Sequence, residues 1–137
     1  MKLLFISLFL ISGCYIDLKD NTVELFIQHV LKNEIKKAYL KLSLNEIKDR
    51  EKAKLRDSIV MVQLNELRDQ LIDKEYSIVS ATEESKWFDK LNTTENEENL
   101  YAILVDSSVL TYILLSDERI KSFSTVNKGG LRSFIFL

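Results

Sequence analysis

The sequence of 137 residues has no proline, three glycines, one cysteine and one histidine. So little proline and glycine argues against a flexible linker protein, and the length fits one domain better than two. A single cysteine excludes an internal disulfide bond. Basic residues number 19 and acidic residues 21, so no excess of positive charge points to a nucleic-acid partner.

The chain also lacks the short motifs of several enzyme classes, including a glycine-rich phosphate loop and the GxSxG, HExxH and CxxC patterns. His29 is predicted on the solvent side of a helix, without a second histidine to share a metal. Glu95, Glu97 and Glu98 lie in a polar stretch without the aspartate and glycine pattern of a calcium loop. We therefore predict no metal, no cofactor and no catalytic residue.

The most specific pattern in the sequence lies in its N-terminal segment. Lys2 precedes an apolar run, Leu3 to Ile11, which is too short to span a bilayer core of about 30 Å. The run ends in Ile11-Ser12-Gly13-Cys14, which resembles the lipobox of bacterial lipoproteins. The resemblance implies cleavage between Gly13 and Cys14, diacylglycerol on the Cys14 sulfur and an acyl chain such as palmitate on the new amino end. The alternative is an apolar N-terminal strand or helix with an ordinary buried cysteine.

This beginning divides the chain into a signal peptide (1–13), a lipidated tether (14–20) and a single domain (21–137). Cleavage removes Lys2 and leaves 18 basic residues (19 minus one) against 21 acidic ones. The residue after Cys14 is Tyr15, whereas aspartate there retains some lipoproteins in the inner membrane. We therefore expect a cell-envelope protein held by its lipid at the outer membrane.

The first half of the domain is predicted to be helical. Asn21-Thr22-Val23-Glu24 fits a capping box, and apolar residues recur at helical spacing from there to Leu42. They cover an arc of about 180°, which is wider than a surface stripe and predicts a helix packed on more than one side. Ser43-Leu44-Asn45-Glu46 fits a second capping box, and residues 44–72 are predicted to form one long helix or two.

The second half is rich in β-branched and aromatic residues. A strand is predicted over Tyr76 to Thr82, followed by an ambiguous segment, Ser85 to Leu91, that fits a helical turn. Four strands of an antiparallel meander are predicted at Leu100–Val105, Val109–Leu115, Ile120–Val126 and Leu131–Leu137. The expected fold class is α+β, with two N-terminal helical segments packed on a curved antiparallel β-meander.

This order of elements resembles the cystatin-like, NTF2-like arrangement over about 110 residues. The closing stretches, Ser116 to Phe123 and Asn127 to Gly130, are similar to the hairpin endings of small lipoproteins of that kind. The resemblance implies that the first helix lies in the concavity of a bent sheet. It brings no catalytic motif, and the fold serves both enzymes and binding modules.

Three residues are candidates for a pocket between helix and sheet. Glu34 falls on the apolar face of the first helix, so it either lines a pocket or pairs with a lysine at the edge of the core, and we favour the pairing. Tyr112 and Phe123 belong, with Trp87, to the aromatics that line a hydrophobic pocket or fill the core. Core packing is the favoured interpretation of these aromatics.

We expect a non-enzymatic envelope lipoprotein whose domain binds a protein or a small apolar ligand near the membrane surface. One alternative is an immunity-type lipoprotein that blocks a toxin, which predicts a toxin gene directly upstream. A second is an NTF2-like pocket enzyme, which needs at least two polar groups converging in a concave site. We make no prediction of oligomeric state from the sequence.

Overall fold

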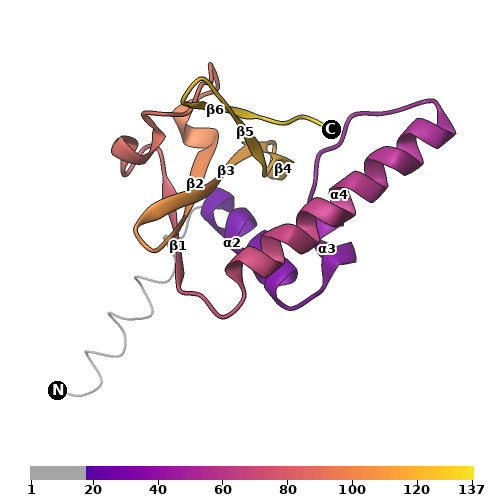
Figure 1. Ribbon diagram of the computed structural model, residues 1–137, viewed down its shortest axis with the longest axis horizontal. Coiled ribbons are helices and arrows are strands. Elements are labelled where there is room, and N and C mark those ends of the chain that lie inside the picture. The colour runs from indigo at the N-terminus through magenta and orange to yellow at the C-terminus, as the bar shows by residue number, and fades with distance from the viewer. Residues whose placement is uncertain (1–17) are drawn as a thin grey trace.

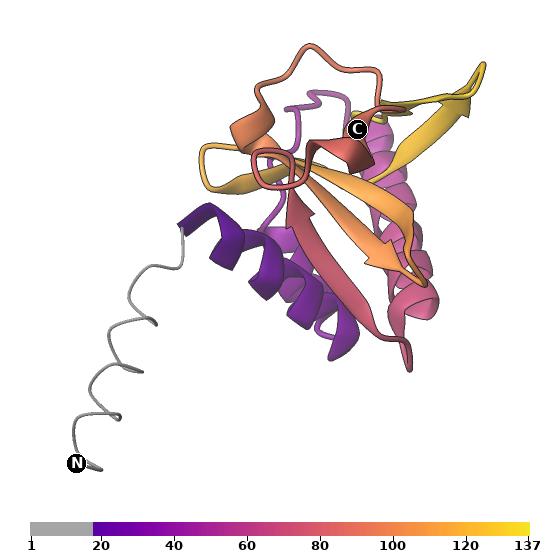
Figure 2. The ribbon, with the colours of Figure 1, turned by 90° about the vertical axis from the view of Figure 1, so that its left-hand side faces the viewer.

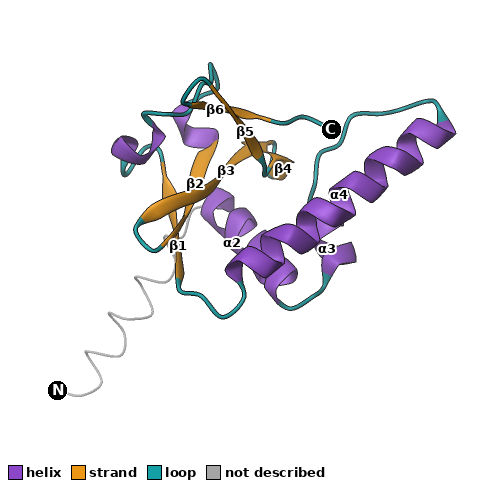
Figure 3. Ribbon diagram, viewed as in Figure 1, coloured by secondary structure: helices purple, strands orange, loops and turns teal. Residues whose placement is uncertain are grey.

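Helices come first and strands follow in the computed structural model, which describes residues 18–137 (Figures 1 and 3). The helices are α2 (Leu18–Leu31), α3 (Ile35–Leu40) and α4 (Arg50–Leu71), with short 3₁₀ helices η2 (Ser85–Phe88) and η3 (Glu97–Asn99). The strands are β1 (Tyr76–Ser80), β2 (Leu100–Val105), β3 (Ser108–Ser116), β4 (Arg119–Ser122), β5 (Thr125–Lys128) and β6 (Leu131–Phe134). The predicted α+β class is confirmed. No helix in this part of the chain is long and apolar enough to cross a membrane.

Strands β1 to β4 form one antiparallel sheet in chain order, and β5 pairs with β6 in a separate two-stranded sheet. Strand β3 lies between β2 and β4, which confirms its predicted central position. Alternate residues of β3 enter different clusters, with Ile113 on the helical side and Tyr112 on the other. Strand β3 is therefore buried on both of its faces, as its apolar sequence predicts. Antiparallel sheets more commonly leave one face exposed to solvent.

Three hairpins share one turn geometry. Asp106-Ser107, Asp117-Glu118 and Gly129-Gly130 each connect paired strands through two residues, and all six residues have positive φ. Loops of this kind match the right-handed twist of the flanking strands, and aspartate and glycine tolerate positive φ best. The predicted breaks at these three points are confirmed.

The predicted strand Ile120–Val126 is wrong as one element, because β4 ends at Ser122 and β5 begins at Thr125. The Ser122 hydroxyl donates to the Ile135 carbonyl at 2.7 Å, and the Ile135 amide donates to the Ser124 carbonyl at 3.0 Å. These bonds turn the chain out of the first sheet and fold the β5–β6 hairpin back over it. The predicted strand over 131–137 likewise ends at Phe134.

The predicted helix from Asn21 to Leu42 is two helices, and Asn21 lies inside α2 instead of capping it. Asn33 has φ of 59°, and the Glu34 amide donates to the His29 carbonyl at 2.8 Å. A helix ends where one residue takes the left-handed conformation and the next amide donates to a carbonyl of the last turn. Asparagine adopts the left-handed conformation readily. The chain therefore turns before α3 starts at Ile35.

The second predicted capping box is also wrong, because α4 begins at Arg50. Asp49 is the N-cap, and its carboxylate accepts from the amides of Glu51 at 3.0 Å and Lys52 at 3.2 Å. Residues 41–43 instead run along the edge of β4, where the Ser43 amide donates to the Ile120 carbonyl at 2.8 Å. The predicted helical stretch over 44–72 is therefore a single helix, preceded by an irregular segment.

The helices pack on one face of the four-stranded sheet, as predicted (Figure 2). Helix α2 contributes four fully buried residues to this core, and α4 contributes a row on its inner face: Val23, Phe26, Ile27 and Val30, then Val60, Leu64, Leu67 and Leu71. The opposite face carries a smaller cluster around Ala102 and Leu114, covered by η2 and β6. The ambiguous segment from Ser85 thus begins as a 3₁₀ helix that covers the sheet.

Candidate functional site

The structure does not bring the three candidate pocket residues together. Glu34 lies directly before α3, Tyr112 belongs to the smaller core cluster, and Phe123 belongs to the main cluster. Of the three, Phe123 lines a cleft, whereas Tyr112 is almost fully buried. Gly13 and Cys14, the predicted cleavage and lipidation residues, lie outside the described residues.

Glu34 pairs at the edge of the core, which is the interpretation favoured above. Its carboxylate lies 2.5 Å from the Lys37 Nζ and 3.5 Å from the His29 Nδ1. The hydrogen bond from Lys37, more than any other contact, holds the pKa of Glu34 below its ordinary value. His29 was predicted to be solvent-exposed, and this is wrong: its side chain is 21% exposed because the turn after α2 folds back over it.

Tyr112 acts as a structural anchor for η2. Its hydroxyl donates to the Trp87 carbonyl at 2.5 Å, and its ring centroid lies 5.4 Å from that of Phe88. The Arg132 guanidinium lies 5.8 Å from the same ring. Burial raises the pKa of the Tyr112 hydroxyl, which therefore stays protonated and keeps donating at neutral pH.

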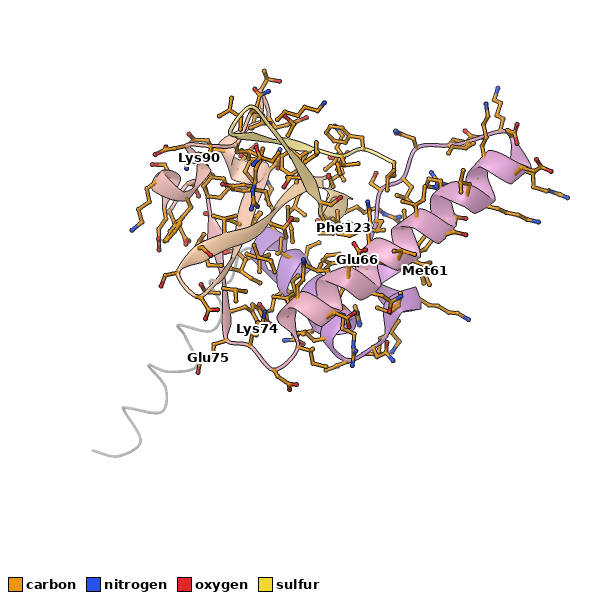
Figure 4. All side chains as sticks on the ribbon, in the orientation of Figure 1. Met61, Glu66, Lys74, Glu75, Lys90 and Phe123 are labelled. Atoms are coloured by element: carbon orange, nitrogen blue, oxygen red, sulfur yellow. The ribbon has the colours of Figure 1, made fainter. Side chains whose placement is uncertain are left out.

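A cleft of about 350 Å³ lies between α4 and the β5–β6 hairpin, and we call it the α4 cleft. Its floor is apolar and is formed by Leu67, Leu110, Phe123 and Ile135. Figure 4 shows Glu66 on α4 and Phe123 at the end of β4 on facing sides of this space. The cleft exists because the bonds at Ser122 and Ile135 turn the hairpin toward α4 instead of extending the first sheet.

The walls of the α4 cleft carry amides, hydroxyls and two opposite charges. Helix α4 supplies Gln63, Glu66 and Gln70, and the strands supply Thr111, Asn127 and Arg132. A chain segment or a small molecule in the cleft would meet hydrogen-bonding groups from both walls.

Two of these side chains are already fixed by the strands. The Thr111 hydroxyl donates to the Phe123 carbonyl at 2.9 Å, and Arg132 donates to the Leu110 carbonyl at 3.0 Å. Gln63 differs, since its Oε1 is buried and accepts no hydrogen bond from the described residues. A buried acceptor without a donor is unfavourable, so Gln63 would gain most from a ligand that donates a hydrogen bond.

The α4 cleft offers hydrogen-bonding groups beside apolar side chains. Its lining has one carboxylate, Glu66, and neither histidine nor cysteine. No group of three or more histidine, cysteine, aspartate or glutamate side chains gathers within residues 18–137 in a way that could hold a metal ion. Sequence reasoning missed this site because amides on an exposed helix look like ordinary solvated surface.

A second cleft, of about 370 Å³, lies beside the start of α2. Its two lysines each pair with a glutamate: Lys19 lies 3.8 Å from Glu98, and Lys121 lies 3.6 Å from Glu95. The acidic stretch over 95–98 thus contacts lysines from α2 and β4. Asp117 and Glu118 also line this cleft, so its carboxylates outnumber its lysines by four to two.

Comparison of the chain with protein-family models, with curated proteins and with solved structures finds no match. The cystatin-like, NTF2-like resemblance therefore stays a prediction from the order of elements, and the function has to be argued from the residues themselves.

Proposed function

We propose that this chain is a non-enzymatic lipoprotein of the bacterial envelope that binds a ligand in the α4 cleft near the membrane surface. The order of Lys2, an apolar run and Ile11-Ser12-Gly13-Cys14 supports export and attachment to a membrane through lipid. Acylation at Cys14 supplies two or three chains, which anchor a protein stably where one chain does not. Tyr15 in place of aspartate supports the outer membrane as the destination.

The start of α2 supports a position close to the membrane. The first described residue of helix α2 is Leu18. Four residue steps separate Cys14 from Leu18, and even fully extended they reach about 14 Å. A ligand of this domain is therefore met within a short distance of the lipid surface.

The observation that carries the binding role is the α4 cleft, with an apolar floor, hydrogen-bonding walls and the unpartnered Gln63 Oε1. Its volume falls in the range of about 300–1,000 Å³ that is typical of small-molecule sites. The sequence led us to expect a protein or a small apolar ligand, and these walls favour a compact molecule that carries both an apolar group and hydrogen-bond donors. Glu66 and Arg132 offset each other's charge, which favours a ligand without a large net charge.

The hydrogen bonding of the polar groups in the cleft favours binding over catalysis. The Thr111 hydroxyl donates to a backbone carbonyl, and no histidine in the lining can take its proton. A hydroxyl becomes a nucleophile when an adjacent base activates it. The cleft therefore supports recognition more directly than it supports the enzyme alternative.

Attachment to a membrane through lipid is tested by Cys14→Ser in cells given labelled palmitate. The unsubstituted chain should carry the label and sediment with membranes, whereas the variant should carry none and accumulate uncleaved or released. Ser12→Ala, which keeps a small residue before the scissile bond, is the matched control and should be labelled normally. Label on the Cys14→Ser variant would contradict the proposal.

The binding role is tested with N-acetyl-phenylalaninamide, a neutral probe that carries one aromatic ring and several amide donors. Titration into the isotope-labelled protein should shift the NMR signals of Thr111, Asn127 and the Gln63 side-chain amide. Signals from the second cleft, such as that of Ser116, serve as the internal control. Shifts confined to the second cleft, or none at the α4 cleft, would count against this site.

A further inference from the structure

Helix α4 carries exposed apolar side chains on a second face, away from the core. Leu55, Ile59 and Val62 are 62%, 39% and 56% exposed. At about 100° per residue they project roughly opposite to the buried face of the same helix, Val60, Leu64, Leu67 and Leu71. An apolar row of this kind on a helix that already packs on the core is unusual for a solvated surface.

The row continues at both ends with charged residues at the same spacing. Lys52 precedes Leu55 by three positions, Glu66 follows Val62 by four, and Asp69 follows by three more. All six positions are exposed, and their steps alternate between three and four residues. This is the heptad spacing of helices that pair with one another. We call these six residues the α4 stripe.

The charges at the ends of the α4 stripe select one orientation for a second copy. A parallel pair would place Lys52 beside Lys52 and Asp69 beside Asp69, and like charges repel. An antiparallel pair places the Lys52 end of one copy against the acidic end of the other. The stripe is thus complementary to itself in the antiparallel orientation.

We propose that the α4 stripe pairs with the same stripe of a second copy, antiparallel, about a twofold axis between Ile59 and Val62. Ile59 of each copy then packs beside Val62 of the other, Leu55 faces Glu66, and Lys52 faces Asp69 of the other copy. Each patch meets itself, so the contact closes as a dimer and does not propagate into a filament.

The residues that flank the stripe allow this approach. In the antiparallel register, Ser58 faces Asn65 and Arg56 faces Gln63, so no like charges meet along the sides. Arg56 is held by Asp57 at 3.0 Å and by the Asn45 carbonyl at 2.6 Å, which keeps it beside the stripe. Figure 1 shows the first half of α4 extending beyond the sheet, where a second helix has access.

The contact is small, with three apolar side chains from each copy, so we expect a weak dimer in dilute solution. The proposed lipid anchor would hold both copies at one surface and raise their effective concentration, which favours pairing without new contacts. The dimer proposal itself rests only on α4 and does not require the anchor or a ligand in the α4 cleft.

Cysteine cross-linking of the full chain in membranes tests both the pairing and its direction. Lys52→Cys and Asp69→Cys are made in separately tagged copies, expressed together and treated with a mild oxidant. The antiparallel pair brings these two positions within the Cα separation that a disulfide spans, about 4.4–6.8 Å, so a mixed dimer should form. Each variant expressed alone should give little dimer, because like positions lie about 25 Å apart along the paired helices.

Three controls keep the result interpretable. The unsubstituted chain should give no cross-linked dimer, which shows that Cys14 does not contribute. Lys54→Cys, exposed on α4 outside the stripe, should not cross-link to Asp69→Cys. Adding Ile59→Asp to both copies should lower the yield about tenfold, the effect of roughly 1.4 kcal/mol on an equilibrium.

Two outcomes would overturn the proposal. Dimer from Lys52→Cys alone, at a yield equal to that of the mixed pair, would mean a parallel or random contact. No mixed dimer, while both proteins are folded and present in the same membrane, would mean that the stripe does not pair. Neither outcome bears on the NMR titration of the α4 cleft, so this inference and the proposed function can fail separately.

Discussion

Helices α2 and α4 differ in how they place their apolar residues. The 14 residues of α2 bury Val23, Phe26, Ile27 and Val30 completely against the sheet and the other helices. The 22 residues of α4 bury four residues on one face and expose three large apolar side chains on the other. Helix α2 thus serves mainly the core, with only Leu25 at the exposed limit, whereas α4 supports the core on one face and leaves a row of apolar side chains exposed on the other.

The largest effect is expected at Phe26, which tests whether α2 is a core helix. This residue is fully buried, and its ring centroid lies 5.6 Å from that of Phe123. Phe26→Ala should lower the free energy of unfolding by about 3–5 kcal/mol, because it leaves a cavity where α2 meets the sheet. Urea denaturation of a soluble form starting at Tyr15, followed by circular dichroism, measures this. A loss below about 1 kcal/mol would mean that α2 is not a core helix.

The same substitution at two valines of α4 compares its buried face with its exposed face. Val60→Ala should destabilise the domain by about 2 kcal/mol, because Val60 is fully buried. Val62→Ala, two residues along and exposed, should change stability by less than about 0.5 kcal/mol. It should instead lower the yield of the Lys52–Asp69 cross-link. Equal destabilisation by the two changes would show that the α4 stripe is already packed against this chain.

A substitution of Gln63, on the wall of the α4 cleft, should affect stability and ligand binding in different directions. Gln63→Leu removes the buried Oε1 that has no donor in residues 18–137, so stability should hold or rise by up to about 1 kcal/mol. The same variant should bind N-acetyl-phenylalaninamide more weakly, with smaller NMR shifts at Thr111. Asn65→Leu, at an exposed position of α4 outside the cleft lining, is the matched control and should leave the NMR shifts at Thr111 unchanged. A destabilised Gln63→Leu would mean that its amide already has a structural partner.

The smallest expected effect is a pH dependence at the contact between α3 and α4. The Tyr39 hydroxyl donates to the Asp57 carboxylate at 2.7 Å, and this bond, together with Arg56, lowers the pKa of Asp57. A lowered folded pKa stabilises the domain above the ordinary value of 3.8, and the contribution is lost as pH falls below it. Because Asp57 is largely exposed, we expect about 0.5 kcal/mol.

Urea denaturation at pH 7 and at pH 3 checks this contribution. Tyr39→Phe should remove about 0.5 kcal/mol at pH 7 and less at pH 3, where a larger fraction of the Asp57 carboxylate is protonated. Asp57→Asn should have a similar pH dependence. The same loss from Tyr39→Phe at both pH values would show that the hydroxyl contributes through packing alone.

Local signals in the sequence predicted the first three strands and the hairpin turns well, whereas the predicted strands over 120–126 and 131–137 were too long. The breaks around Asp106-Ser107, Asp117-Glu118 and Gly129-Gly130 are formed by residues that favour positive φ, and the structure confirms each one. Helix ends were predicted less well, since a capping pattern competes with contacts made elsewhere. Ser43 fits an N-cap but instead bonds Ile120, which is 77 residues away in the chain.

The α4 cleft could not be predicted from the sequence for the same reason. Its walls come from α4 and from a hairpin that the Ser122–Ile135 bond folds back, and both ends of that bond look like parts of ordinary strands. Gln63 in isolation resembles a solvated helix residue. Glu34, in contrast, was interpreted correctly as an edge carboxylate, because its lysine partner lies one helical turn along the chain.

The lipid anchor decides whether this domain works at a membrane, and the amino end of the chain purified from membranes tests it most directly. Mass spectrometry of that end should find Cys14 as the first residue, with diacylglycerol on its sulfur and an acyl chain on its nitrogen. A chain that begins at Met1, or a Cys14 that carries a free thiol, would contradict the anchor.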